Sequence, residues 1–525
     1  MMSLLYKKRR VQKLNVNELH LNGWSLEPIG ADDLKAFPCK ESPIFNVDPN
    51  AFKGLQSSYD RVRLFDAPFA HIVNNNKVNK YCSHCLRLPE EGKELQHCGA
   101  CAFAKYCSKD CQKLAWKMHR TECRRLNGVF PNLPLTEVLF LSRCIDKVIF
   151  LEEFGDKFGW EKVRKWSDVM GHHDDIRADK EKMAHFEKIY TKISAFRKEE
   201  MIDKDKFFDI FCKVTINSHS VHTNGGDEIG MSMDLGVSMY DHSCRPNCTM
   251  VFDGYRVFLR PLSQEISPYD TKRSFISYID VGRSRYQRRL ELKGKWYFDC
   301  QCDRCKDPED DILTSIQCAN KACDEPLITS EDAGPMMIVC PKCKTIAPED
   351  YVVAAQELMK TLPVRFDPKT PLNVVEEELK KAETLLHPQN IYINRMKTTI
   401  CHITGKFEQA IDMQKLVYEN YKRCFPAMDR HNGFQLINIV RSLIEAGDRK
   451  SAVPYAFDAM TIFEVCFGMD HPYYLQTLAL WTFLEKDIPK TDEELLKLTI
   501  YGDTRPVNIG AYLGTTSIPG YKPDA

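Results

Sequence analysis

The chain has 525 residues, with 73 basic and 73 acidic side chains and no formal net charge. This length is too great for one hydrophobic core and predicts several domains, and the balanced charge argues against a dedicated nucleic-acid binder. No apolar run approaches the roughly 20 residues that cross a bilayer, and the amino end is unlike a signal peptide, so we expect a soluble intracellular protein.

The cysteines indicate metal binding. Of the 22 cysteines, 15 fall into closely spaced sets, and in a reducing compartment such sets favour metal sites over disulfides. The scattered cysteines are Cys39, Cys144, Cys212, Cys248, Cys401, Cys424 and Cys466.

The first 80 residues are weakly patterned. Residues 7–10 are four consecutive basic residues, which suit either a nuclear localisation signal or a solvated tail. We expect the protein in the cytoplasm and the nucleus. Residues 62–73 then predict one β-strand that is kinked at a proline.

The strongest motif is a run of four ligand pairs between residues 82 and 123. Eight ligands are enough for two zinc ions, since each ion takes four. The last two pairs have the i, i+4 spacing that places both ligands on one face of a helical turn. The pairs are Cys82 with Cys85, Cys98 with Cys101, Cys107 with Cys111, and His119 with Cys123.

This segment resembles a MYND finger, most clearly over residues 104–119. The resemblance implies that the pairs interleave. One zinc would be held by Cys82, Cys85, Cys107 and Cys111, and the other by Cys98, Cys101, His119 and Cys123.

MYND fingers also bind proline-rich peptides, and Gln112 and Trp116 lie at a helical spacing that would let both line a peptide groove. The alternative is that the two zinc ions only replace a hydrophobic core in a segment too small to build one.

Residues 124–215 are helical by hydrophobic period, for example over 135–150 and 182–193. Residues 171–175 read Gly-His-His-Asp-Asp. For this stretch we favour a solvated loop over a metal site, because no further ligands flank it.

Residues 217–305 carry the densest set of motifs. The runs at 249–252 and 255–259, joined by Asp253 and Gly254, predict a β-hairpin, and residues 274–279 predict a third strand that carries Tyr278. Asp241, His242 and Ser243 include the residue types of a hydrolase triad, but consecutive side chains point apart and cannot form its geometry.

One lone cysteine and a tight downstream cluster supply the four thiolates of a structural zinc. Such a zinc would clip the segment after Phe298 onto the turn at residues 241–247. The ligands would be Cys244, Cys300, Cys302 and Cys305.

Together these motifs resemble a SET domain, and with the finger inserted the chain resembles the SET and MYND domain (SMYD) family of protein-lysine methyltransferases. The resemblance rests on definite motifs from residue 61 to 308. It implies an α+β multi-domain protein with a SET-type β-fold split by a zinc-binding MYND finger, a cysteine-rich post-SET zinc segment and a C-terminal TPR-like helical domain.

The expected domains are the N-terminal part of the SET domain (1–80), the MYND finger (81–124), a helical SET insertion (125–215), the SET core (216–290), the post-SET segment with a second cysteine quartet (291–350) and the helical domain (351–525).

The resemblance further implies methyl transfer from S-adenosylmethionine to lysine side chains of protein substrates. Tyr278 would stand at the mouth of the lysine channel, Phe298 would stack on the adenine, and Trp296 or Tyr297 would wall the channel. The implied cofactor contacts are Asn217, Asp241, His242, Tyr278 and Phe298.

Two positions depart from the family pattern. Asp241 stands where SET enzymes normally have asparagine; its carboxylate can accept from the cofactor's ammonium but would repel the cofactor's carboxylate, so we expect weaker cofactor binding. The family's amino-terminal glycine-rich turn is reduced to Gly54 within residues 53–55.

A second cysteine quartet follows an acidic linker and has zinc-ribbon-like spacing. It predicts a further zinc site, with four unligated thiols as the alternative. Its members are Cys318, Cys323, Cys340 and Cys343.

Residues 351–485 are helical, and two short motifs recur at an offset of 42 residues, at 405–410 with 447–452 and at 424–425 with 466–467. This period resembles tetratricopeptide-type helix pairs. Such an array would bind a peptide or cover the SET cleft, or serve only as a buttress.

We therefore expect a methyltransferase with structural zinc ions. The rival interpretation is an inactive SET and MYND adaptor that recruits partners through proline-rich or acidic peptides. A basic stripe on the finger helix suits DNA as well as solvent, and we favour solvent. We expect protein substrates, no direct nucleic-acid contact, no membrane association and a monomer. The stripe comprises Lys105, Lys109, Lys113, Lys117 and Arg120.

Overall fold

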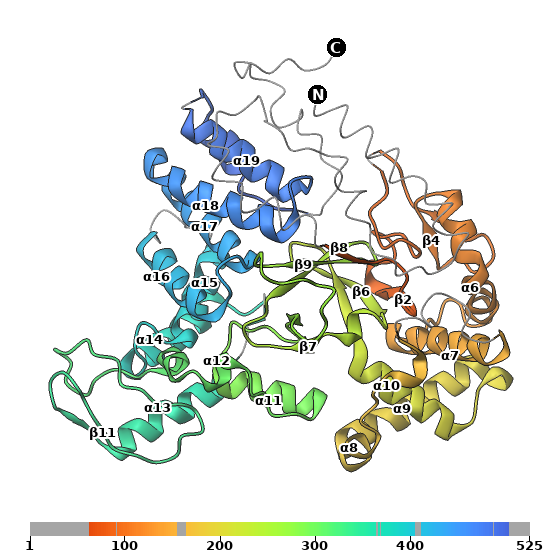
Figure 1. Ribbon diagram of the computed structural model, residues 1–525, viewed down its shortest axis with the longest axis horizontal. Helices are drawn as coiled ribbons and strands as arrows, with labels where there is room; N and C mark the ends of the chain where they lie inside the picture. Colours follow the sequence, from red (N-terminus) through yellow and green to blue (C-terminus); the bar gives the residue numbers. More distant parts are fainter. Residues whose placement is uncertain are drawn as a thin grey trace.

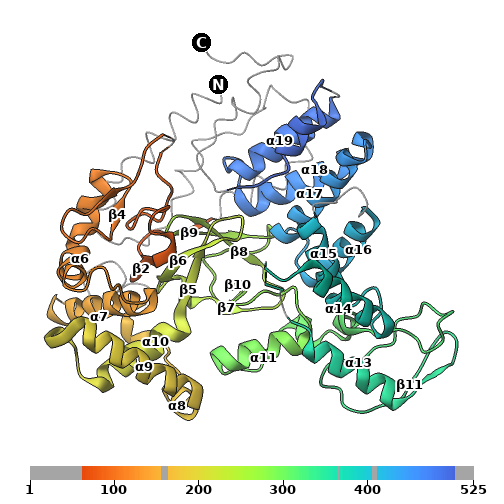
Figure 2. The same ribbon diagram turned by 180° about the vertical axis from the view of Figure 1, so that it is seen from behind.

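The computed structural model describes residues 62–90, 92–154, 164–363, 366–367, 369–404, 411–486 and 488–502. A β-rich centre lies between two mainly helical parts (Figures 1 and 2). The part before the centre in sequence carries α6–α10, and the part after it carries α13–α20. The chain is an α+β protein, as predicted. The expected glycine remnant at 53–55 and the basic residues 7–10 lie outside the described residues.

Three small sheets form the centre. Strands β1, β9 and β8 make one antiparallel sheet, β2, β6 and β5 make a second, and β7 and β10 pair in parallel. The bounds are β1 Arg63–Phe65, β2 Ala70–Val73, β5 Ser218–His222, β6 Glu228–Met233, β7 Asp241–His242, β8 Cys248–Asp253, β9 Arg256–Pro261 and β10 Phe275–Ile276.

The single kinked strand predicted at residues 62–73 is wrong, because this stretch forms two strands. β1 pairs with β9 and β2 pairs with β6, so the two halves belong to different sheets. Pro68 lies between them and has no N–H to donate to a ladder, which ends the first strand and lets the chain change sheet.

The β8–β9 hairpin is present, but its loop is shifted by one residue from the prediction. Asp253 pairs with Arg256, so the loop is Gly254 and Tyr255. Gly254 has a φ of +65°, and a Cβ there would come within 1.8 Å of the Cys85 carbonyl oxygen. Glycine is therefore required both by the turn and by the contact of the hairpin tip with the cysteine-rich finger.

The third strand is shorter than the predicted range of 274–279. β10 comprises only Phe275 and Ile276, beside Asp241 and His242 of β7. Beyond it, the Tyr278 N–H donates to Nδ1 of His242 at 3.0 Å. A side chain thus replaces the strand carbonyl as acceptor, and the ladder ends before Tyr278.

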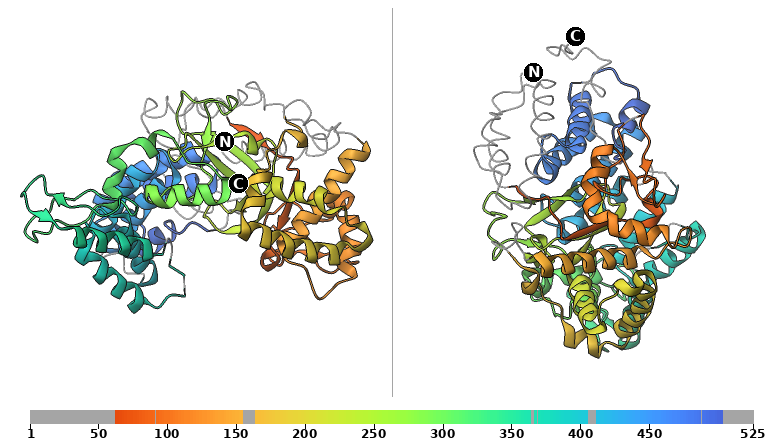
Figure 3. Two further views of the ribbon diagram at one scale, coloured as in Figure 1. Left: turned by 90° about the horizontal axis from the view of Figure 1, so that it is seen from below. Right: turned by 90° about the vertical axis from the view of Figure 1, so that its right-hand side faces the viewer.

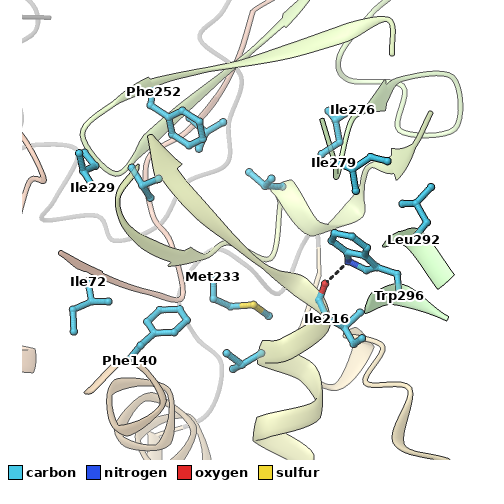
Figure 4. Close-up of a cluster of buried hydrophobic side chains, with 14 of the residues drawn as sticks. Ile72, Phe140, Ile216, Ile229, Met233, Phe252, Ile276, Ile279, Leu292 and Trp296 are labelled. Carbon is cyan, nitrogen blue, oxygen red and sulfur yellow. Dashed lines mark hydrogen bonds between the residues drawn. The ribbon is translucent and has the colours of Figure 1, made fainter. Parts of the chain in front are cut away.

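Helices α7–α10 confirm the helical prediction for residues 124–215. Phe140 of α7 lies beside Ile72 of β2 and Met233 of β6, so this helix covers one face of the second sheet (Figure 4). The loop predicted at 171–175 is only partly a loop, because α8 begins at His173. The bounds are α7 Thr136–Phe154, α8 His173–Ala178, α9 Lys180–Arg197 and α10 Lys204–Asn217.

The finger between β2 and α7 is built from a short hairpin and one long helix. Its elements are β3 Gln96–His97, β4 Lys105–Tyr106 and α6 Lys109–Asn127. None of the helices in the described ranges combines the length and apolar character needed to cross a membrane.

After the centre, two short helices and a small hairpin lead into a helical region. The hairpin segment projects from the body of the molecule (Figure 3, left). The elements are α11 Arg285–Trp296, α12 Asp303–Lys306, β11 Ile338–Val339, β12 Ile346–Ala347, α13 Glu349–Thr361, α14 Leu372–Leu385, α15 Ile391–Thr404, α16 Ile411–Cys424, α17 Arg430–Glu445, α18 Arg449–Phe467, α19 Pro472–Glu485 and α20 Asp492–Lys497.

Each helix from α14 to α19 packs against its neighbour in sequence. The recurring Cys-Phe pairs fall at equivalent places, at the carboxyl ends of α16 and α18. Residues 405–410, the first copy of the other repeated motif, lie outside the described residues. The kinship with tetratricopeptide units stays a prediction.

A buried arginine ties this helical region to the centre. Nη1 of Arg304 donates to the carbonyl oxygens of Val281 at 2.6 Å and Cys424 at 2.8 Å. Its Nε donates to Asp310 at 2.8 Å, and Arg288 donates to the other oxygen of Asp310 at 2.8 Å. Both arginines are completely buried, so the shared carboxylate is essential to balance their charge.

Replacing Arg304 by methionine should therefore destabilise the junction, because Arg288 and Asp310 lose part of a buried charge network. We expect the Tm to fall by roughly 5–10 °C, from a loss of about 3 kcal/mol. Differential scanning calorimetry checks this. The matched variant Arg289→Met removes a half-exposed arginine of α11, whose only ion pair is a weak one with Asp299 at 3.9 Å among the described residues, and should leave the Tm nearly unchanged. Equal Tm values for both variants would contradict the role of Arg304.

Candidate active site and metal centres

Sixteen Cys and His side chains gather into four groups with the geometry of metal ligands. In each group the potential ligand atoms all lie within 4.8 Å of one another. A tetrahedral zinc site with Zn–S bonds of about 2.3 Å places its sulfurs roughly 3.8 Å apart. The sulfur–sulfur distances of 3.4 Å between Cys107 and Cys111 and 3.9 Å between Cys244 and Cys300 bracket this value.

The finger contains two of these groups, and their ligand pairs interleave along the chain. The first group is Cys82, Cys85, Cys107 and Cys111, and the second is Cys98, Cys101, His119 and Cys123. These are the sets that the MYND resemblance implies.

The expectation that both i, i+4 pairs lie on a helix holds for only one of them. His119 and Cys123 lie within α6, but Cys107 precedes the helix, whose first residue is Lys109. Ser108 caps the helix by accepting a hydrogen bond from the Cys111 N–H at 3.1 Å. The cap stops the helix before Cys107 and turns this thiol back toward Cys85, 3.7 Å away.

A buried carboxylate orients the histidine of the second finger group. Oε2 of Glu122 lies 3.0 Å from Nδ1 of His119, which leaves Nε2 facing Cys101 at 3.6 Å. Arg143 donates to both oxygens of Glu122, at 2.7 and 2.9 Å. Burial alone would raise the pKa of Glu122, but Arg143 and His119 outweigh it and lower this pKa to about 2. This is the carboxylate–histidine arrangement typical of metal centres.

The third group joins two distant parts of the chain. Cys244, from the turn after β7, lies 3.6 Å from Cys305, and Cys300 and Cys302 complete the set. Nη2 of the buried Arg288 lies 3.8 Å from the Cys305 sulfur and offsets the negative charge of the thiolates.

The fourth group is the second cysteine quartet. Cys318 lies 3.5 Å from Cys343, and Cys323 lies 3.8 Å from Cys340. Strands β11 and β12 flank the Cys340–Cys343 knuckle, so this group closes the projecting hairpin segment onto itself.

Four aromatic side chains gather beside the third group. The Tyr278 ring lies 5.4 Å from His242 and 5.1 Å from Trp296, and His242 lies 6.3 Å from Phe298, between ring centroids. The structure thus brings together Tyr278, His242 and Phe298, three of the cofactor contacts that the family resemblance implies.

The hydroxyl of Tyr278 is fixed by the main chain. It donates to the Tyr240 carbonyl oxygen at 2.6 Å. Burial, and to a smaller extent the charge of Asp241, raise the pKa of Tyr278, while Arg164 lowers it; the net pKa is about 12. Tyr278 therefore keeps its proton at neutral pH.

Trp296 and Tyr297, the two candidates for the channel wall, lie differently. Trp296 is buried beside Tyr278, and its Nε1 donates to the Ile216 carbonyl at 2.9 Å (Figure 4). Tyr297 has a φ of +60° and turns its hydroxyl to Asp179 at 3.2 Å. Of the two, Trp296 has the position suited to a channel wall.

Asn217 and Asp241 both precede the four aromatic residues in the chain. Nδ2 of Asn217 donates to the carbonyl oxygens of Met170 at 2.7 Å and Lys213 at 2.8 Å, so it ties the loop before α8 to the end of α10. Asp241 is exposed at the start of β7.

Sequence reasoning missed two residues of the site. Tyr240 supplies the carbonyl that holds Tyr278, a main-chain role with no sequence signature. Arg164 lies in an irregular segment between α7 and α8, where hydrophobic period gives no guidance, and it affects the pKa of Tyr278.

Residues 82–123 match the family model described as MYND finger. The histone-lysine N-methyltransferase ASHR1 of Arabidopsis thaliana is 24% identical over 78% of this chain and 88% of its own length. The human histone-lysine N-methyltransferase SMYD3 is 30% identical over 50% of this chain and 61% of its own. The human N-lysine methyltransferase SMYD2 is 24% identical over 78% of this chain and 90% of its own.

The chain is similar to SMYD-type lysine methyltransferases. Such relatives match most of this chain as well as the finger, so the likeness includes the β-rich centre and the helical region that follows it.

Proposed function

We propose that this protein transfers methyl groups from S-adenosylmethionine to lysine side chains of protein substrates. The observation that carries the proposal is the placement of Tyr278. Its hydroxyl donates to the Tyr240 carbonyl, and its ring lies beside those of His242 and Trp296. This group lies next to the turn that contains Cys244. The names of the relatives, which are histone-lysine and N-lysine methyltransferases, support the same reaction.

The side chains of the site fit the parts of this cofactor. Phe298 is a partly buried ring that offers a stacking face for an adenine, and His242 lies beside it. Asp241 offers a carboxylate for an ammonium group. Asn217, His242 and Phe298 would hold the nucleoside end, and Asp241 the amino-acid end.

The reaction needs a neutral amine aligned with the bond that breaks. S-adenosylmethionine supplies a methyl group on a positively charged sulfur. Because the Tyr278 proton is engaged by Tyr240, the Tyr278 oxygen presents its lone pairs to the amine and orients it. Trp296 would exclude water from one side of the lysine channel. The amine loses its proton to solvent before transfer, since neutral Tyr278 is not a base at pH 7.

We further propose that all four Cys and His groups hold structural zinc. Each set is complete, and a catalytic zinc keeps one position open for water. On this proposal zinc shapes the site and takes no part in methyl transfer.

The purified full-length chain should contain four equivalents of zinc, measured by mass spectrometry of the metal. Cys318→Ser should reduce the content to three, because it opens only the fourth group. Cys401→Ser, which changes a buried cysteine outside the groups, should retain four. A wild-type content of three would exclude the fourth site.

Tyr278→Phe should fold normally and lose methyl transfer by roughly 100-fold or more, because the amine is no longer oriented. Transfer of a labelled methyl group to a protein extract measures it. The control Tyr269→Phe removes a hydroxyl that donates to the Val62 carbonyl at 3.1 Å outside the aromatic group, and it should stay active. Near-normal turnover of Tyr278→Phe would refute its role.

The rate of transfer should rise from pH 7 to pH 10. The pKa of Tyr278 is raised to about 12, so its proton stays in place throughout this range. The target lysine has a pKa of about 10.4. Below that pH, the neutral fraction of its amine increases roughly tenfold for each unit by which the pH rises. Single-turnover rates across the range test this; a fall in rate while circular dichroism stays constant would contradict it.

A role for the finger in peptide capture is a second proposal, favoured by Trp116. This side chain is 43% exposed on α6, unusual for a tryptophan, and Gln112 lies one turn earlier. A flat exposed ring is suited to proline side chains. Titration with S-adenosylmethionine separates the enzyme from a pure adaptor, since an adaptor should give no heat of binding.

A further inference from the structure

Asp241, the residue that departs from the family pattern, has a free carboxylate. It is exposed at the start of β7, one residue before His242. Within the described ranges no hydrogen bond or ion pair occupies its oxygens. A carboxylate in this position binds a cation or repels an anion, so its surroundings decide what the change does.

Arg164 is held against Ser238, three residues before Asp241. Its Nη1 donates to the Ser238 carbonyl oxygen at 2.6 Å and to Oγ of Ser238 at 3.2 Å, and its Nη2 lies 3.4 Å from the Asp168 carbonyl oxygen. Ser238 belongs to the short 3-10 helix Val237–Met239, which leads directly into Asp241.

The segment that carries Arg164 is itself anchored. The ring of Trp166, two residues later, stacks on Phe69 with a centroid distance of 4.6 Å and an angle of 15°. The Lys213 ammonium lies over the Trp166 ring, 5.1 Å from the ring centroid. Arg164 is therefore held beside the turn before any ligand binds, which lowers the entropic cost of using it.

Arg164 and Asp241 influence each other without touching. Burial lowers the pKa of Arg164, and the charges of Asp168, Tyr278 and Asp241 act in the opposite direction. Yet no ion pair within 4.0 Å joins Arg164 to Asp241 among the residues that the structure describes. The hydrogen bonds to Ser238 hold the cation against the turn that begins β7 at Asp241, so both charges belong to the surroundings of this one turn.

We propose that Arg164 and Asp241 together bind the zwitterionic α-amino-acid end of the methyl donor, with Asp241 accepting from its ammonium group and Arg164 donating to its carboxylate. This rests on the proposed function. Because Arg164 balances Asp241, the expected repulsion between Asp241 and the donor's carboxylate does not arise. The aspartate is then a working part of the site rather than a sign of lost activity.

The test uses three thioadenosine ligands and isothermal titration of the full-length protein. S-adenosylhomocysteine carries both charged groups, 5′-S-(3-carboxypropyl)-thioadenosine lacks the ammonium, and 5′-S-(3-aminopropyl)-thioadenosine lacks the carboxylate. Arg164→Gln should weaken the carboxypropyl ligand about tenfold or more and leave the aminopropyl ligand unaffected. Asp241→Asn should do the reverse. Both substitutions should weaken S-adenosylhomocysteine.

The crossed pattern separates binding from a structural role. If Arg164 only supported Ser238, Arg164→Gln would weaken all three ligands equally, and that result would overturn the proposal, as would no change. Lys192→Gln, an exposed cation on α9, should alter nothing, and Tm measurements verify that each variant is folded. If the wild-type protein bound none of the ligands, the proposed function itself would fall; binding without the crossed pattern overturns this inference alone.

Discussion

The site depends on one connection, the gathering of Cys244 with Cys300, Cys302 and Cys305. These sulfurs come from segments some 60 residues apart, and their grouping joins the turn after β7 to the segment after α11, where Arg245 also pairs with Asp307 at 3.7 Å. Four thiolates in a largely buried position repel one another unless a cation holds them. On the proposal that this group holds zinc, the cation compensates most of the thiolate charge, and the buried Arg288 next to Cys305 offsets the remainder.

The reactive side chains lie very near these ligands in the chain. His242 comes two residues before Cys244, and Phe298 comes two residues before Cys300, so clamping the cysteines also fixes the two rings. Tyr278 is then positioned by two hydrogen bonds, from its N–H to His242 and from its hydroxyl to Tyr240. Arg304 extends the same unit to Cys424 of the helical region. The cysteine group beside the aromatic side chains thus fixes where His242 and Phe298 lie.

The sequence predicted best what short-range chemistry determines. Short ligand spacings identified the finger pairs, the Cys300–Cys305 cluster and the second quartet, while the family resemblance implied how the finger pairs interleave; periodicity located the helices. It predicted poorly what depends on distant partners. The strand at residues 274–279 ends early because His242, from another segment, takes the Tyr278 N–H. The strand at residues 62–73 divides because its halves find different partners.

Arg164 illustrates why a departure from a motif cannot be judged residue by residue. Taken alone, an aspartate in place of an asparagine predicts repulsion of the donor's carboxylate and weaker binding. The energy of a charge, however, depends on every other charge within a few ångströms, and Arg164 lies 77 positions earlier in an irregular segment. Only the fold brings it to Ser238 and so beside Asp241. On the proposal above, the charge of Arg164 balances that of Asp241. A substitution at a charged site is therefore informative only together with the residue that faces it.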